Sequence, residues 1–354
     1  MLQNFATTIL CITLLGCTAS TQDGIIRDML SERIANSPTW IDQPGLQVLI
    51  CGSGGPLVAT DRAAACVAVV AGGKMYIVDV GAGSAENLGA WQAPMAKIAG
   101  VFLTHFHSDH IMELGEFNLQ SWAAGREAPL PVYGPTGVEQ VVTGFNTAYA
   151  QSRSYRTAHH GADFLKPETG LLKAHPFTVA TGASPNDTTV VLESDGLVVR
   201  AFSVAHPPVS PAVGYRFDYA GRSVVITGDT GPSEAVVSAA KDVDVLVHDA
   251  MAHHMMNIVS EVAAEAGLDR NAKIAHDVPE YHASVTEAAK AANDAGAKLL
   301  VMYHLVPPPQ NFVLERIFLR GVDDVRSEDV VLAEDGMWID LPPDSDEILQ
   351  DSVR

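Results

Sequence analysis

The chain has 354 residues, of which 47% are hydrophobic and 18% charged, and its formal net charge is −20. This length allows one large domain or two small ones with a real core, and the composition excludes a low-complexity or disordered chain. Since nucleic acids bind to basic surfaces, the negative balance argues against a nucleic-acid partner unless a local basic patch supplies the contact.

The first 20 residues predict an export signal. Their apolar stretch is too short to span a membrane comfortably and has the length of a signal-peptide core. Leu14-Leu15-Gly16-Cys17 is similar to a bacterial lipobox and implies membrane attachment through a lipidated Cys17, although no Lys or Arg precedes it. We expect an exported protein, in the periplasm or anchored at the outer membrane as a lipoprotein, with plain secretion as the alternative to lipidation. Residues 21–44, polar and interrupted by proline, predict a linker.

The folded part of the chain is expected to begin with short β-strands. Residues 46–52, 66–72 and 74–81 are apolar runs separated by glycine-rich turns. Cys51 and Cys66 fall in two of these runs, where they either pair in an oxidising compartment or remain two small buried residues in neighbouring strands. We favour the unpaired alternative.

Three histidines and an aspartate crowd the end of the next apolar run. A helix-like piece at residues 85–91 precedes a strand at 99–105, and an amphipathic helix is expected over 111–124. The loop between this strand and this helix carries four candidate ligands: His105, His107, Asp109 and His110.

The middle of the chain continues with strands and helices. Residues 129–135 predict a strand and 137–150 a helix, whereas 151–188 are irregular and rich in Gly, Pro and His, as an insertion or a lid would be. Further strands are expected over 188–194, 197–206 and 212–229, the last a hairpin closed by Ala220-Gly221.

The last third of the chain predicts two buried strands, a helix and a terminal hairpin. The strands cover residues 244–250 and 297–304, and 329–341 predict the hairpin. Ser284, followed three positions later by Glu287, forms a capping-box pattern that begins the helix.

The repeated order of strands, helix, strand and helix indicates the α/β fold class. Two mixed β-sheets are expected to pack face to face with helices outside, as an αββα sandwich. No linker interrupts residues 45–345, so we expect one domain there, followed by a tail at 346–354.

The clustered histidines predict a metal site. Imidazole nitrogens and carboxylate oxygens suit Zn²⁺, and four such side chains at one strand end would otherwise carry a large desolvation cost. His105 and His107 point the same way if strand geometry persists, so they can share one ion. Asp109 and His110 lie past the bend and can face a second ion.

Three other expected strands also terminate in residues that bind metals. These residues are His206, Asp229 and His304. Each alone reads as an ordinary polar loop residue, but together with the cluster they predict ligands from four strand ends. Asp79 ends another strand and is a candidate outer partner for a ligand imidazole.

The order HxHxDH, a single His, an Asp in GDT and a final His resembles the metallo-β-lactamase superfamily. The resemblance covers residues 46–341 and is nearest to the ribonuclease Z branch and its exported arylsulfatase-type relatives. It is carried further by CGSGGPLVATDR, YIVDVGAGS, HPPVSPAVGYRF, VHDAMA and YHASVTEAAKAANDAGAKLLVMYH. The fold that this resemblance implies is again the αββα sandwich.

The resemblance also implies two metal ions, which we expect to be Zn²⁺, with another divalent metal as the alternative. The implied ligands are His105, His107 and His206 for one ion, Asp109, His110 and His304 for the other, and Asp229 between them. Two ions about 3.5–4 Å apart clamp a hydroxide nucleophile and stabilise charge on the attacked centre. We expect Asp109 to orient that hydroxide.

Two further residues match the pair that assists the leaving group in this family. The family uses a Glu and a His, and the matching positions here are Asp249 and His282. The expected catalytic residues are therefore Asp109, Asp249 and His282, with an aspartate one methylene shorter than the family's glutamate.

Two departures from the ribonuclease Z pattern argue against an RNA substrate. The arm that clamps tRNA in that branch lies between GYR and GDT, where this chain has only FDYAGRSVVIT. LVPPP follows the final His, where the branch carries a serine and an Arg-Tyr pair. With the acidic charge and the expected export, these departures predict an exported di-zinc hydrolase of a small-molecule ester, either an aryl sulfate or a phosphodiester, without a nucleic-acid partner.

Other functions rank below this one. A lactonase, whose site also uses a bridging Asp, is the first alternative. A tRNA 3′-processing endoribonuclease, a β-lactamase and a metal-binding lipoprotein without catalysis follow.

Overall fold

The computed structural model describes residues 19–35, 40–179 and 187–354. The chain divides into two compact units, residues 1–40 and 41–354. Helix α2 (Ala19–Ala35) covers the last two residues of the expected export signal and the first part of the expected linker. Residues 1–18 of the expected export signal, with Cys17, lie outside the described residues. Among the described residues, no helix is both long and apolar enough to cross a membrane.

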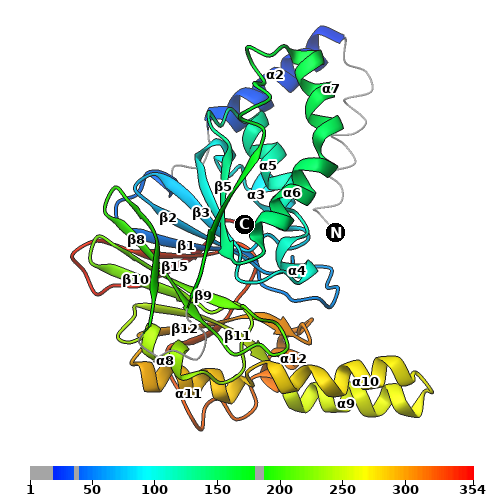
Figure 1. Ribbon diagram of the computed structural model, residues 1–354, viewed down its shortest axis with the longest axis vertical. Helices are drawn as coiled ribbons and strands as arrows, with labels where there is room; N and C mark the ends of the chain where they lie inside the picture. The colour runs from blue at the N-terminus through cyan, green and yellow to red at the C-terminus, as the bar shows by residue number, and fades with distance from the viewer. Residues whose placement is uncertain (1–18, 36–39, 180–186) are drawn as a thin grey trace. The chain divides into compact units, whose positions relative to one another are not determined.

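Residues 41–354 form a sandwich of two mixed β-sheets with helices on both outer faces (Figure 1), which confirms the expected fold class. The first sheet has the order β15 (Leu349–Ser352), β14 (Met337–Leu341), β1 (Leu46–Gly52), β2 (Cys66–Ala71), β3 (Lys74–Val78), β4 (Ile98–Phe102), β5 (Leu130–Pro135) and β6 (Leu172–Phe177). The second has the order β13 (Val330–Leu332), β12 (Leu299–Val306), β11 (Val245–Met251), β10 (Arg222–Ile226), β9 (Val213–Tyr219), β8 (Leu197–Ser203) and β7 (Thr189–Ser194).

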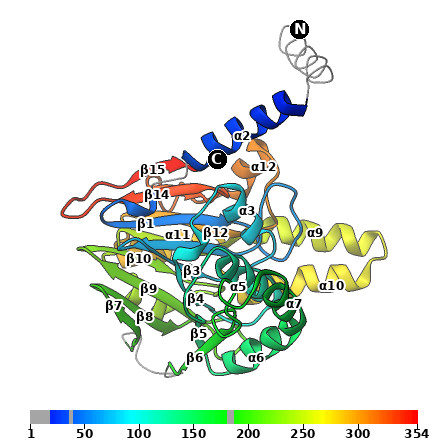
Figure 2. The same ribbon diagram turned by 90° about the horizontal axis from the view of Figure 1, so that it is seen from above.

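The helices cover both sheets from outside. They are η1 (Trp40–Asp42), α3 (Ser84–Ala90), η2 (Met95–Lys97), α4 (Ser108–Ile111), α5 (Leu114–Ala123), α6 (Val138–Ala148), α7 (Ala150–His160), α8 (Glu234–Ala239), α9 (His253–Glu265), α10 (Asp269–Asp277), η3 (Val278–Tyr281), α11 (Val285–Ala295) and α12 (Phe312–Phe318). On the first sheet, α3 packs against β1 and α6 against β5 and β6, while α11 packs against β11 and β12 of the second. The paired helices α9 and α10 project from the sandwich (Figure 2).

The central strands are apolar on both faces because both of their faces are covered. Val69 and Val224 pack between the two sheets, whereas their neighbours Val225 and Leu246 pack outward beneath α8 and α11. A central strand buried on both sides needs a continuous apolar run. This explains why the sequence showed short apolar runs in place of a clear alternation.

The predicted terminal hairpin is wrong. β13 pairs with β12 in the second sheet, whereas β14 pairs with β1 in the first, so residues 333–336 cross between the sheets. Two short apolar runs around an Asp-Gly pair look locally like a hairpin, but the free edges of two different sheets decide the pairing. The expected tail after residue 345 contains β15, which pairs with β14.

Residues 151–188 are more regular than the sequence suggested. They include most of α7 and all of β6, while residues 180–186 lie outside the described part. The sequence signal was weak because α7 is mostly polar and buries none of its residues, so it has too few apolar residues to mark a helix.

Cys51 and Cys66 form a disulfide, so the preference for unpaired cysteines is wrong. They lie on the adjacent antiparallel strands β1 and β2 with their Cα atoms 5.0 Å apart, inside the range that a disulfide requires. The bond closes the loop formed by residues 52–65.

Candidate metal centre

The clustered ligand residues follow β4 and enter the short helix α4. His105 lies just beyond the end of the strand, and His107 is the N-cap residue of α4. Asp109 and His110 then occupy the first turn of α4 and are largely buried. The bend expected after His107 therefore separates two pairs of side chains.

The remaining ligand residues come from the second sheet. His206 follows β8, and Asp229 follows β10. His304 lies inside β12 and not at its end, with a left-handed backbone (φ 49°). The register of β12 with β11 shifts near this residue, and such a bulge re-aims a side chain.

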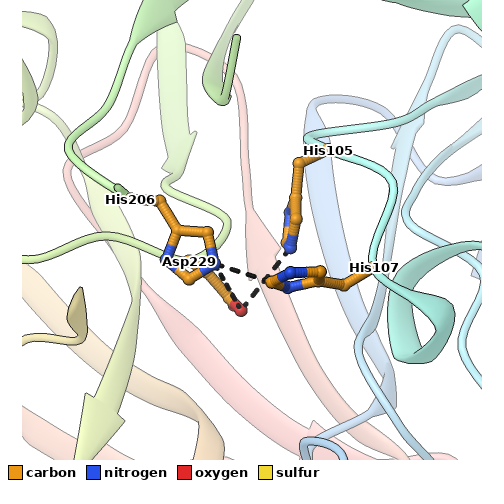
Figure 3. Close-up of side chains that lie close together, drawn as sticks. All are labelled: His105, His107, His206 and Asp229. Atoms are coloured by element: carbon orange, nitrogen blue, oxygen red, sulfur yellow. Dashed lines mark hydrogen bonds and ion pairs between the residues drawn. The ribbon is translucent and has the colours of Figure 1, made fainter. Parts of the chain in front are cut away.

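All seven residues expected to bind metal are brought together, in two groups of converging atoms. The groups are His105, His107, His206 and Asp229, and next to them Asp109, His110 and His304. Within each group the candidate ligand atoms lie within 4.8 Å of one another. Figure 3 shows the first group, whose side chains arrive from both sheets and point to one centre.

The Asp229 carboxylate lies between the two groups. Its Oδ2 is 3.7 Å from His105 Nε2 and 3.8 Å from His206 Nε2, in the first group. Toward the second group, Oδ2 is 3.3 Å from His110 Nε2, and Oδ1 is 3.3 Å from His304 Nε2. One carboxylate therefore reaches both candidate centres.

Asp79 and Thr104 set the tautomers of two ligand imidazoles. Asp79 Oδ2 accepts hydrogen bonds from His110 Nδ1–H at 2.8 Å and from the Thr104 hydroxyl at 2.8 Å. Because the Thr104 hydroxyl donates to Asp79, its oxygen accepts from His105 Nδ1–H at 3.1 Å. Both imidazoles consequently turn Nε2 toward the cluster, the nitrogen that would bind a metal ion once it carries no proton.

The buried ligand atoms fit a divalent cation. His105 Nε2, His110 Nε2 and Asp229 Oδ1 are buried without a hydrogen-bond partner. A buried polar atom left unsatisfied costs about 1–3 kcal/mol, and three such atoms facing one another are the arrangement that a bound metal ion resolves. Nitrogen and carboxylate oxygen are ligands that zinc accepts.

The first group offers neutral imidazoles. Burial, reinforced by the neighbouring His110, holds the pKa of His105 well below its usual value. Burial also lowers the pKa of His107 and of His206. Neutral imidazole is the form that binds a metal ion.

The two carboxylates at the centre remain ionised. Burial opposes the charge of Asp229, but His110 and His304 hold its pKa well below the usual range. Burial also opposes the charge of Asp109, but the hydrogen bond from His304 Nε2 at 3.2 Å lowers its pKa. Burial opposes a positive charge on His110 and His304, but the Asp229 carboxylate raises the pKa of both. A divalent cation bound there would displace their protons and take over the attraction of the buried carboxylates.

Asp249 and His282 are paired beside this centre. Asp249 Oδ2 accepts from His282 Nδ1–H at 2.9 Å, and His282 Nε2 lies 3.9 Å from Asp229 Oδ2. The ring of His282 is therefore fixed by a buried carboxylate and turned toward the cluster. His282, Asp229 and His304 also offer atoms close enough to form a third group that could hold an ion.

The other histidines have structural contacts. His253 Nε2 lies 3.1 Å from the carbonyl of His282, and His254 Nε2 lies 2.9 Å from the carbonyl of Ile317, so both fasten the start of α9. His248 is buried, and its Nδ1 bonds to the backbone carbonyl of Asp249. None of these three residues belongs to either ligand group.

The sequence did not reveal the cavity beside Asp109 or the residue that shapes it. This cavity has a volume of about 810 Å³ and is lined by Asp109, the loop 55–64 and Trp91. The buried Asp335 fixes the loop, because its carboxylate accepts from Ser53 N, Ser53 Oγ and Ala63 N. Asp335 precedes Gly336 in the turn of the expected terminal hairpin, where an aspartate is common. No pattern in the neighbouring sequence could therefore have indicated its contacts with residues 53 and 63.

The chain is similar to known hydrolases over most of its length. A family model described as a beta-lactamase superfamily domain matches residues 77–305. Ribonuclease Z of Mycobacterium bovis (strain BCG / Pasteur 1173P2) is 36% identical over 265 residues, which are 74% of this chain and 86% of that protein. Ribonuclease Z of Mycobacterium marinum is 34% identical over 74% of this chain and 87% of that protein.

Solved structures share the fold. The short form of human tRNase Z has a TM-score of 0.60 and 21% identity, covering 84% of this chain and 99% of that one. The metallo-beta-lactamase fold protein YhfI from Bacillus subtilis has a TM-score of 0.57 and 20% identity, covering 83% of this chain and 98% of that one.

These relatives contradict the expected hydrolysis of a small-molecule ester without a nucleic-acid partner. Proteins that are 34–36% identical over about three-quarters of the chain are named as ribonucleases and not as arylsulfatases. The physical reason for the error is that net charge describes the whole surface, whereas an RNA contact needs only a local one.

Proposed function

This chain belongs to the metallo-β-lactamase superfamily and is a relative of ribonuclease Z, and from that premise we propose that it hydrolyses phosphodiester bonds in RNA. The observation that carries the proposal is the Asp229 carboxylate, whose two oxygens face two groups of imidazole and carboxylate ligands. Phosphodiester hydrolysis develops negative charge on the phosphoryl oxygens, and a site with two cation positions suits that charge.

The side chains of the two ligand groups fit two Zn²⁺ ions. His105, His107 and His206 would hold one, Asp109, His110 and His304 the other, with Asp229 shared. Bound ions would supply Lewis acidity and an activated water. The protein holds the ligands in place through Asp79 and through the carbonyl of Tyr281, which accepts from His206 Nδ1–H at 3.1 Å.

We assign His282 as the group that protonates the leaving oxygen. When the P–O bond breaks, the departing oxygen carries the bonding electron pair and takes a proton. His282 Nε2 faces the cluster while Asp249 fixes the opposite nitrogen, so a proton at Nε2 is held where the leaving oxygen would be.

The cavity beside Asp109 suits a nucleotide. A volume of about 810 Å³ lies within the range of small-molecule sites. Trp91 lies in its wall, and an aromatic ring offers a nucleobase a stacking surface whatever the base. Met112 and the loop 55–64 complete a largely apolar wall next to the ligand residues.

The proposal is tested with the zinc-loaded full chain on three substrates: a tRNA precursor with a 3′ extension, bis(p-nitrophenyl) phosphate and p-nitrophenyl sulfate. We expect cleavage of both phosphodiesters and none of the sulfate ester. Asp229→Asn should abolish both activities and lower the metal content below that of the wild type, while Asp218→Asn, a partly exposed aspartate on β9, should change neither. Cleavage of the sulfate with intact RNA would overturn the proposal.

A further inference from the structure

We propose that residues 150–173, here called the basic segment, form the surface on which the RNA substrate docks. The basic segment comprises α7 and the chain that follows it to the start of β6. This inference rests on the proposed RNA-cleaving function and names the part of the protein that holds the RNA outside the metal centre.

The basic segment is positively charged, whereas the chain as a whole is negatively charged. It carries four basic residues against two acidic ones, a formal charge of +2 in a chain of −20. Within it, α7 has no acidic residue and carries two arginines and two histidines. The other projecting element, from α9 to α10, carries four acidic residues against two basic ones and is therefore unsuited to a polyanion.

The cations of the basic segment lack carboxylate partners. Exposed lysines elsewhere, such as Lys74 and Lys273, form ion pairs with neighbouring aspartates. Among the described residues, no carboxylate forms an ion pair with any of the segment's four cations: Arg153, Arg156, Lys166 and Lys173. Arg156, Lys166 and Lys173 are exposed, so their charge is available to phosphate groups, the partners that Arg and Lys bind in nucleic acids.

Two aromatic side chains stand among these cations. Tyr155 on α7 is 67% exposed, and Phe164 in the following loop is 85% exposed. Exposed aromatic rings are free to stack on nucleobases, and base stacking is worth about 1–3 kcal/mol per base in proteins that bind single strands. Unpaired cations with interleaved aromatics are the combination that such proteins use.

The basic segment is fastened to helix α5, beside the metal ligands. Trp122 Nε1 donates to the carbonyl of Lys166 at 3.0 Å, and Asn118 Nδ2, also on α5, donates to the carbonyl of Gly170 at 2.8 Å. Tyr149, just before α7, packs against Gly115 at the start of α5. Figure 1 shows α5, α6 and α7 together on the side of the first sheet that carries α4, the helix that contains Asp109 and His110.

The test removes two exposed cations and compares them with a matched pair elsewhere. Arg156→Gln with Lys166→Gln is the test variant, and Lys241→Gln with Arg270→Gln is the control, since each loses one Arg and one Lys from an exposed position. The zinc-loaded full chain is titrated with a mature tRNA, so binding is measured apart from cleavage. Rates on bis(p-nitrophenyl) phosphate report the metal centre.

We expect the test variant to bind tRNA at least about tenfold more weakly at low salt, which corresponds to losing charge-assisted contacts. The slope of log K against log salt should shrink by about 1.4–1.8, because each phosphate contact contributes about 0.7–0.9. The control variant should match the wild type, and all variants should hydrolyse the small phosphodiester equally. In a second arm, Phe164→Ala should weaken binding of an oligouridylate about fivefold or more without changing the salt slope.

Unchanged tRNA affinity and salt slope in the test variant would overturn the proposal, as would an equal loss in the control. Loss of binding to anionic phosphatidylglycerol vesicles with RNA binding intact would also overturn it and assign the surface to a membrane. If the wild type binds tRNA through this surface but cleaves no RNA, the proposed function fails while the docking surface stands. If it cleaves RNA with no dependence on these residues, the docking surface fails alone.

Discussion

At the scale of single residues, the buried carboxylate of Asp79 shows how a side chain that binds no metal controls one that does. It accepts from His110 Nδ1–H and from both the backbone N–H and the hydroxyl of Thr104. Its backbone is left-handed, with φ 57°, a conformation that Asp and Asn adopt more readily than most residues. An Asp79→Asn substitution therefore tests the carboxylate without straining the chain.

We expect Asp79→Asn to weaken zinc binding about 10–100-fold, the usual cost of losing an outer partner. An amide N–H turned toward His110 Nδ1 would favour the proton on Nε2, the atom that faces the cluster. Competition with a chelator measures the affinity. Asp195→Asn is the control, because Asp195 is also left-handed (φ 51°) but exposed. Equal affinities in both variants would show that Asp79 does not set the tautomer.

The role assigned to His282 predicts a dependence on the leaving group. General acid catalysis typically contributes about 10²–10⁴-fold and matters most for a poor leaving group. His282→Ala should therefore lose far more rate on RNA, whose leaving group is an alkoxide, than on bis(p-nitrophenyl) phosphate, and should keep its metal. His276→Ala, an exposed histidine on α10, should change neither rate. Equal losses on both substrates would remove the support for this role, and a loss of metal would make His282 a ligand.

At the scale of elements, the disulfide between β1 and β2 closes the loop that lines the cavity. Cys51 and Cys66 are separated by 15 residues, and a closed loop of that length contributes about 3 kcal/mol by restricting the unfolded chain. Asn87 Nδ2 adds a hydrogen bond from α3 to the carbonyl of Cys51 at 2.9 Å. The loop is thus held at its base by a covalent bond and at its centre by Asp335.

Replacing both cysteines by alanine should lower the free energy of unfolding by about 3 kcal/mol in urea titrations. Either single substitution, Cys51→Ala or Cys66→Ala, should cost nearly as much as both together, because breaking one end breaks the bond. Two smaller losses that add up to the double loss would instead attribute the cost to packing.

At the scale of the whole sandwich, Asp244 links the second sheet to the end of the chain. Its carboxylate contacts Arg222 Nη2 at 3.1 Å and Lys298 Nζ at 3.0 Å, and accepts from Ser223 N at 2.8 Å. Arg222 in turn donates from Nη1 to the carbonyl of Pro342, just past β14 of the first sheet. One buried cluster therefore holds both sheets at the same end.

Asp244 predicts an acid-dependent stability. Burial opposes its charge, but Arg222, the Ser223 N–H and Lys298 hold its pKa below the usual value. A depressed folded pKa means that the stabilisation is complete above the unfolded value of about 3.9 and is lost as pH falls through the folded pKa. Asp244→Asn should cost about 1–3 kcal/mol near pH 7, and the difference should vanish in acid.

Urea titrations from pH 7 down to about pH 3 would measure this dependence. Asp346→Asn is the control, because Asp346 is exposed and shares the partner Lys298. It should leave the stability unchanged. A difference between Asp244→Asn and the wild type that stays constant with pH would show that the carboxylate charge is not the cause.

The sequence by itself determined the fold class and the residues that converge on the candidate metal centre. Strand and helix periodicity is local, and His105, His107, Asp109 and His110 are neighbours along the chain. The two-residue turn at Ala220-Gly221 and the helix begun by Ser284 were equally local, and both occur where the sequence placed them. The ligand roles of these residues stay a prediction until metal is measured, and the export signal stays one because residues 1–18 lie outside the described part.

Only the tertiary structure decided what depends on contacts distant in the chain. It set the pairing of Cys51 with Cys66, the separation of β13 from β14 into two sheets and the bulge that aims His304. It also placed α7, which the sequence could not show because a mostly polar helix that buries no side chain has too few apolar residues to mark it. Which cations of α7 and the following chain lack a carboxylate partner depends on how the neighbouring elements pack. The net charge of −20 describes the whole chain and therefore could not show where RNA would bind.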